Sequence, residues 1–216
     1  MNKINYQKEL DNLINNITKE GQVPSLLLHS CCGPCSSYCI EYLSQYFSIT
    51  VYYYNPNIYP DEEYYTRVKE QQKFIDSFPA VHPVSFIEGD YDKPRFYDIA
   101  KGLEQEPEKG ARCHKCYDLR LRRTAEVAKE KGFDFFSTTL TISPMKDSQV
   151  LNQIGQKIAE EVGIDWLPSD FKKKNGYKRS TELSKEYDMY RQDYCGCVYS
   201  YRDRQLEKQA KENMED

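Results

Sequence analysis

The chain lacks the features that would take it into or across a membrane. No segment approaches the ~20 consecutive apolar residues of a transmembrane helix. The N-terminal segment MNKINYQKELDNLI also lacks the apolar core of a secretory signal peptide. These absences predict a cytoplasmic protein with no membrane partner. Because the cytoplasm is reducing, its eight cysteines are expected to serve as metal ligands or redox catalysts rather than as structural disulfides.

Positive charge and tryptophan are scarce as well. The formal net charge is −4, which argues against a nucleic-acid binder that depends on bulk positive charge. One tryptophan stands against nineteen tyrosines, which favours amphipathic surfaces that stack or form hydrogen bonds. The sequence shows no internal repeat and no low-complexity segment. Its 216 residues suit one α/β domain with a buried core rather than two.

Strand and helix patterns alternate along the chain. Apolar runs favour strands at 26–28, 49–54, 81–87, 133–141 and 164–167. Helical spacing favours helices at 5–19, after the first cysteine motif, at 61–78, from about 115, at 147–162 and after Ser180, which is expected to cap its helix. Residues 88–111 are expected to form a long polar loop. The alternation predicts a parallel sheet covered by helices on both faces, with its ligand site beyond the carboxyl ends of the strands.

Seven of the eight cysteines lie in three short motifs: Cys31, Cys32 and Cys35; Cys113 and Cys116; Cys195 and Cys197. The first motif closes the first strand and opens a helix, where a thiol tends to ionise. The second opens the helix before the fourth strand. If strands one and four are neighbours, the two motifs can meet in space. The eighth cysteine, Cys39, is interpreted as a buried helix residue.

The spacings of these cysteines are compatible with three kinds of site: a redox-active dithiol, a zinc site and an iron–sulfur cluster. Cys32-Gly-Pro-Cys35 has the dithiol spacing of thioredoxin-like oxidoreductases. The same pair with Cys113 and Cys116 fits a structural zinc site. Cys31 and Cys32 with Cys113 and Cys116 would instead supply four thiolates to a [4Fe–4S] cluster, because adjacent cysteines reach two irons of a cluster more easily than one tetrahedral ion. Cys195-Gly-Cys197 predicts either a strained, easily reduced disulfide or two free thiols.

Five motifs together resemble the QueH family of epoxyqueuosine reductases: HSCCGPC, NPNIYPDEEY, RCHKCYDLRL, TLTISPMKD and YCGCVYS, in this order from about Leu26 to Arg202. The resemblance implies a five-stranded parallel sheet of the adenine-nucleotide α-hydrolase (HUP) type, with strand order 3-2-1-4-5. It implies the last step of queuosine synthesis, in which an epoxide on the tRNA wobble nucleoside becomes an alkene with release of water. The alternative function that involves no catalysis is that of a structural zinc- or RNA-binding protein.

The resemblance also implies roles for single residues. Cys31, Cys32, Cys113 and Cys116 match the ligands of a [4Fe–4S] cluster, and Cys195 and Cys197 match a redox-active disulfide that an unidentified electron donor would reduce. The resemblance further implies a second metal beside the cluster, with Cys35 as its candidate ligand. This metal is expected to be a mononuclear iron, which zinc can replace in a purified sample. The domains expected are a helical extension at 1–24, the HUP-like catalytic domain at 25–202 and a charged tail at 203–216.

The reaction needs a proton donor and an RNA surface. The sequence offers five donors for the leaving oxygen, with Asp147 as the candidate catalytic acid: His29, Tyr53, Tyr59, Asp147 and Tyr177. Tyr52–Tyr54 and Tyr64–Tyr65 are expected to stack on bases of the anticodon loop. Two basic runs are expected to hold its phosphates: Arg120, Arg122 and Arg123; Lys172, Lys173, Lys174, Lys178 and Arg179.

Overall fold

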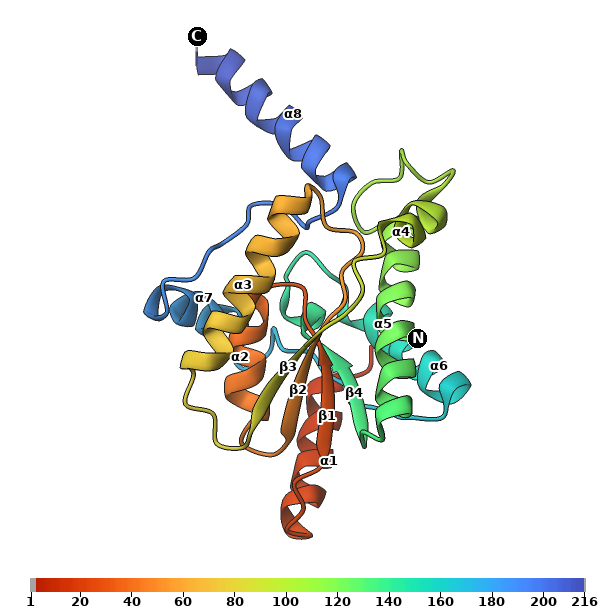
Figure 1. Cartoon of the computed structure of the whole chain (residues 1–216), viewed down its shortest axis with the longest axis vertical. Helices are drawn as coiled ribbons and strands as arrows, with labels where there is room; N and C mark the ends of the chain where they lie inside the picture. Colours follow the sequence, from red (N-terminus) through yellow and green to blue (C-terminus); the bar gives the residue numbers. More distant parts are fainter. Residues whose placement is uncertain (1–2, 216) are drawn as a thin grey trace.

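The computed structural model describes residues 3–215 and shows one parallel sheet with helices around it (Figure 1). The strands are β1 (Ser25–His29), β2 (Ser48–Tyr53), β3 (Val84–Glu88), β4 (Phe135–Thr138) and β5 (Asp165–Trp166). They pair in parallel in the order β3-β2-β1-β4-β5. The order 3-2-1-4-5 and the α/β class are confirmed. Residues 1, 2 and 216, which belong to the expected N-terminal extension and C-terminal tail, lie outside the described residues.

Helices cover both faces of the sheet, as predicted. The helices are α1 (Tyr6–Lys19), α2 (Gly33–Leu43), α3 (Asp61–Ser77), α4 (Lys93–Ala100), α5 (Ala111–Lys131), α6 (Ser148–Val162), α7 (Gly176–Glu186) and α8 (Val198–Glu215). Side chains of β1 alternate between two apolar clusters, because successive residues of a strand point to opposite faces. Leu26 and Leu28 pack with α1, α2 and α3, whereas Leu27 packs with α5 and α6.

The strand order reverses its direction between β1 and β4. His29 at the end of β1 lies opposite Thr138 at the end of β4. The chain continues from β1 into α2 on one face, and from β4 through a short 3₁₀ helix (Thr139–Ile142) into α6 on the other. Such a reversal opens a crevice beyond the strand ends, where ligands of open α/β sheets bind. The first cysteine motif lies at this point.

Several predicted boundaries were wrong. Residues 88–111 contain α4, whose buried Phe96 packs against Cys116 of α5 and Cys197, contacts that local sequence does not reveal. The fourth strand ends at Thr138, where the 3₁₀ helix begins. Helix α7 starts at Gly176, so Ser180 does not cap it. The Ser180 hydroxyl instead donates to the Tyr177 carbonyl within the helix.

The two ends of the chain differ in how they relate to the sheet. Helix α1 buries Leu10, Ile14 and Ile17 in the same cluster as β1, so it forms part of the core. Helix α8 leads away from the body of the molecule (Figure 1). No helix within residues 3–215 is long and apolar enough to span a membrane.

Candidate metal centre

The loop after β1 is fixed so that three cysteines reach the start of α2. Cys32 caps α2 in extended conformation, and Pro34 in its first turn suits a position whose amide needs no partner. The Asn55 amide donates to the Ser30 carbonyl at 2.8 Å. The Ser30 hydroxyl donates to Gln71 Oε1 at 2.7 Å. These bonds brace the loop from β2 and from α3.

The sulfur atoms of Cys31, Cys32 and Cys35 lie within 4.8 Å of one another. Within residues 3–215, no other three His, Cys, Asp or Glu side chains come together in this way. The sulfurs of Cys31 and Cys32 are 3.8 Å apart, close to the ~3.8 Å between two thiolates that each lie about 2.3 Å from one tetrahedral ion. Hydrogen bonds with Cys32 and Cys35 outweigh burial and lower the pKa of Cys31 well below its usual value. The same contacts and burial raise the pKa of Cys35 and raise that of Cys32 to about 12, so Cys31 is the thiolate of the group, and a thiolate suits a soft metal.

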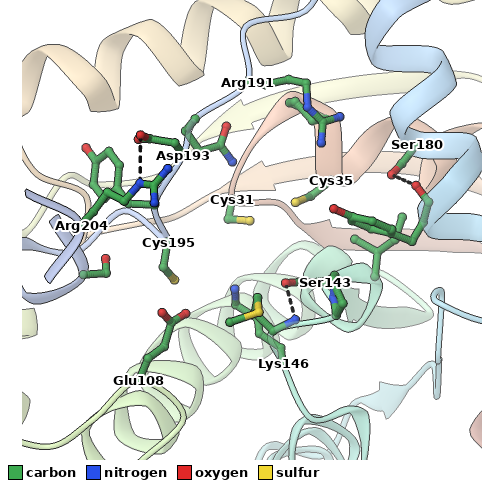
Figure 2. A pocket seen from close by; sticks show the side chains of 18 of the residues that line it. Cys31, Cys35, Glu108, Ser143, Lys146, Ser180, Arg191, Asp193, Cys195 and Arg204 are labelled. Carbon is green, nitrogen blue, oxygen red and sulfur yellow. Dashed lines mark hydrogen bonds and ion pairs between the residues drawn. The ribbon is translucent and has the colours of Figure 1, made fainter. Parts of the chain in front are cut away.

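Two of the three residues, Cys31 and Cys35, border a cavity of about 410 Å³ beyond the strand ends (Figure 2). Cys31 and Cys35 lie on one side of it, and Cys195, from the segment before α8, lies on another. Lys146, between the 3₁₀ helix and α6, faces the same space. Three segments that are distant in sequence therefore meet around one cavity.

The second cysteine motif reaches this region through the first turn of α5. Cys113 packs against the apolar cluster that contains Cys31 and Cys32. Cys116, one turn further, packs with Cys197 and Phe96. The structure thus brings Cys31, Cys32 and Cys35 into one group, whereas Cys113 and Cys116 lie outside that group and close to Cys195 and Cys197. The four-thiolate ligand set stays a prediction.

Comparison with known proteins identifies the family. The family model described as "Epoxyqueuosine reductase QueH" matches residues 26–203. The chain belongs to the QueH family of epoxyqueuosine reductases. A QueH of Streptococcus pyogenes serotype M1 is 46% identical over 221 residues, covering 99% of this chain and 87% of that protein. A QueH of Staphylococcus epidermidis is 44% identical, with 92% and 85% covered, and one of Haemophilus influenzae is 43% identical, with 82% and 72% covered.

In this QueH chain, Arg67 of α3 and Tyr59, just before that helix, hold the third cysteine motif, of which Cys195 lines the cavity. Cys195 and Cys197 are both free thiols, and none of the eight cysteines, all within the described residues, forms a disulfide. The Tyr59 amide donates to the Gly196 carbonyl at 2.8 Å, and Arg67 Nη1 donates to the Cys195 carbonyl at 3.3 Å. The redox-active disulfide therefore stays a prediction, with both of its thiols at the site.

Gly196 has a backbone that only glycine adopts easily. Its φ is +129°, and an added Cβ would lie 3.1 Å from Arg67 Nη1 and 3.2 Å from Ile58 Cγ1. We expect Gly196→Ala to lower the free energy of unfolding by about 1–3 kcal/mol, the usual cost of such strain. Urea unfolding of the anaerobic protein measures this. Gly21→Ala, whose added Cβ would meet nothing within 4 Å at φ +63°, is the matched control and should cost less. An equal loss in both variants would contradict the role of the contacts around Gly196.

Several cations are buried near the thiols, and three of them bear on the group around Cys31. Arg67, Arg120 and Lys146 are 1%, 2% and 9% exposed. Arg67 pairs with Glu63 at 2.7 Å, whereas Arg120 donates only to the Cys116 carbonyl and to Asn55 Oδ1, each at 3.3 Å. Burying an ion costs several kcal/mol unless an opposite charge compensates it. The thiols are the groups placed to supply that charge.

The predicted proton donors lie in different surroundings. Asp147 is exposed and accepts a hydrogen bond from the Gln149 amide at 2.8 Å as the cap of α6, and it does not line the cavity. His29 is enclosed between Thr138 and Tyr54, and burial together with the Arg120 charge lowers its pKa to about 3. The buried Tyr53 hydroxyl donates to the Cys31 carbonyl, Tyr59 supports Gly196, and only Tyr177 of the five lines the cavity.

The predicted RNA contacts are mostly occupied. Arg120 is buried, which removes it from the side chains that a phosphate can reach. Ion pairs with nearby carboxylates engage Arg122, Arg123, Lys172, Lys174, Lys178 and Arg179. Exposed pairs are worth only ~0–1 kcal/mol, so phosphates can compete with them, and Lys173 is exposed. Four of the five tyrosines expected to stack on bases are buried in the core: Tyr52, Tyr53 and Tyr54, in or next to the inner strand β2, and Tyr64 of α3. Tyr65 is the exposed member of the expected stacking groups.

Sequence reasoning missed Arg67 and Lys146. Lys146 had a usable signal, since it follows the fourth strand on the side where α/β sheets bind ligands. Arg67 had none, because it lies inside a helix whose orientation over the third cysteine motif depends on the whole fold. Both side chains approach the thiols from elements distant in sequence.

Proposed function

We propose that this chain reduces epoxyqueuosine in tRNA, converting the epoxide of the wobble nucleoside into an alkene with release of water. Membership in the QueH family supports the reaction. The observation that carries the proposal to these residues is the cavity of about 410 Å³ bordered by Cys31, Cys35 and Cys195. Metal-binding thiols and a separate redox thiol thereby face the same space.

We propose that Cys31, Cys32, Cys113 and Cys116 hold a [4Fe–4S] cluster. The surrounding charges support an anionic occupant, since a cluster with four thiolates would compensate buried Arg120 and Lys146, for which residues 3–215 supply no carboxylate. The contact of Cys113, on the first turn of α5, with the apolar cluster that contains Cys31 and Cys32 supports the ligand set, and Cys116 lies one turn further along the same helix. When bound, such a cluster supplies electrons one at a time.

A second metal site would involve Cys35. This thiol lines the cavity and belongs to the compact group with Cys31 and Cys32. We propose that Cys35 helps to hold a mononuclear ion, iron in the cell, beside the cluster. An ion there would lie toward the substrate, where it can polarise an oxygen atom.

Cys195 and Cys197 complete the electron balance. Converting an epoxide into an alkene and water consumes two electrons and two protons. Oxidation of two thiols to one disulfide releases the same number of each. Cys195 borders the cavity and Cys197 packs with Cys116, so the pair lies between the substrate space and the proposed cluster. A donor outside this chain would reduce the disulfide after each turnover.

The function is tested with anaerobically purified protein and tRNA that carries epoxyqueuosine. We expect a brown protein with a thiolate–iron absorption shoulder near about 400 nm, with iron and acid-labile sulfide, and we expect nucleoside analysis to show queuosine after a reductant is added. A colourless protein with one zinc and no sulfide after anaerobic reconstitution would indicate the structural zinc site. Insulin reduction lost in Cys32→Ser but kept in Cys113→Ser would indicate the thioredoxin-like alternative.

A further inference from the structure

Lys146 is the buried cation among the described residues that line the cavity, which Arg191 and Arg204 also border. It is 9% exposed and lines the cavity, where Figure 2 places it across from Cys31 and Cys35. The segment that carries it is fixed, because its amide donates to the Ser143 carbonyl at 3.1 Å and its carbonyl accepts from Lys172 Nζ at 3.1 Å. The position of the side chain is therefore set by the backbone around it.

The ammonium group of Lys146 has unused hydrogen-bonding capacity. Within residues 3–215 it forms no ion pair and donates no hydrogen bond, and the thiols of Cys195 and Cys31 are the strongest charges that act on it. An ammonium offers three donors and no acceptor. The ammonium is not among the sealed-off polar atoms that lack a partner but opens onto the cavity, so a substrate that fills this space must offer it an acceptor. The site therefore calls for an oxygen or anionic group delivered into the cavity.

The other buried cations near the thiols, Arg67 and Arg120 among them, do not line the cavity, although Arg67 Nη2 also lacks a hydrogen-bond partner. The guanidinium of Arg67 is engaged by Glu63 and the Cys195 carbonyl. The guanidinium of Arg120 donates to Asn55 Oδ1 and to the Cys116 carbonyl. Both guanidinium groups therefore bond to backbone carbonyls of the cysteine motifs without lining the cavity. Lys146 faces the space that the substrate would fill.

We propose that the Lys146 ammonium binds the epoxide oxygen of the substrate and stabilises the negative charge that grows on it as the carbon–oxygen bond opens. This inference rests on the proposed function. Lys146 supplies no electrons. The overall step is dithiol plus epoxide to disulfide plus alkene plus water, and the oxygen that Lys146 holds is the one that leaves as water. A fixed donor aimed at developing charge in an enclosed site is a strong source of rate enhancement.

Binding without turnover separates this role from a structural one. The product alkene lacks the epoxide oxygen, so the wild-type protein, loaded with metal and with Cys195 and Cys197 first oxidised to the disulfide, should bind epoxyqueuosine tRNA roughly tenfold or more tighter than queuosine tRNA. Lys146→Met should abolish that preference and lower the turnover rate by about 100-fold or more, with iron content and absorption spectrum unchanged. Lys146→Arg, which keeps the charge, should retain part of the preference. Lys157→Met, which removes a 70%-exposed lysine on α6, is the control and should behave as wild type.

The outcomes are distinguishable. Preference for the epoxide that persists in Lys146→Met overturns the proposal. So does loss of iron in both Lys146 variants, which would make the residue a support of the metal centre. A wild-type protein that turns over substrate but binds the two tRNAs equally also overturns the role of Lys146 while leaving the proposed function standing. A loaded wild-type protein that produces no queuosine overturns the proposed function itself.

Discussion

Replacing Cys31 by serine is expected to remove most of the bound iron and to lower turnover by more than about 100-fold, because even residues outside the ligand shell cost 10–100-fold when changed. Cys31 is the thiol whose pKa lies well below its usual value, and it touches both partners of its group. A serine hydroxyl binds iron or zinc poorly in comparison. Iron and sulfide determination, followed by turnover of epoxyqueuosine tRNA, measures both effects.

Cys39 provides a matched control for that substitution. It is also a buried cysteine of α2, but its thiol donates to the Cys35 carbonyl at 3.4 Å and it is not a member of the group of three. Cys39→Ser should keep the metal and most of the activity. Full iron content in Cys31→Ser would remove this residue from the ligands, and iron loss in Cys39→Ser alone would show that the centre lies elsewhere.

The second large effect is expected from Cys195→Ser combined with Cys197→Ser. Turnover should fall to the background of the assay, since no dithiol remains to complete the two-electron balance. Metal content and absorption spectrum should stay as in the wild type, because neither residue belongs to the compact thiol group. Queuosine formation and iron content are measured on the same preparation.

The same double variant separates a redox role from a ligand role. Iron lost together with activity would make Cys195 or Cys197 a ligand, an outcome that the packing of Cys197 against Cys116 makes worth testing. Activity that survives would show that electrons reach the substrate without this pair. Gel analysis of thiols trapped before and after one turnover in the wild type shows whether the pair becomes oxidised.

Much of the fold was accessible from local patterns. The apolar runs of β1 and β2 and the alternation with helices predict a parallel sheet, because strands buried on both faces need apolar side chains throughout. The order 3-2-1-4-5 came from the resemblance rather than from these patterns. Helix α4 and the true start of α7 were missed, because Phe96 and Gly176 derive their positions from contacts with distant segments.

Of the candidate site, the part that lies within one short sequence motif was predicted, and the part that depends on the tertiary fold was not. The motif HSCCGPC holds three thiols close together in sequence, so their proximity in space follows from a few residues at a strand end. Lys146 and Arg67 reach the thiols only through the tertiary fold. Side chains read from the sequence as RNA contacts, such as Arg179 with Glu41 at 2.7 Å, turned out to have intramolecular partners that lie far away in sequence.

Nucleoside analysis of tRNA from a strain in which this gene is deleted, and which has no second reductase, tests the central claim most directly. If this chain reduces epoxyqueuosine, the deletion strain should accumulate epoxyqueuosine and contain no queuosine. The wild-type gene should restore queuosine, and the Cys31→Ser gene should not. Unchanged queuosine in the deletion strain would contradict the account.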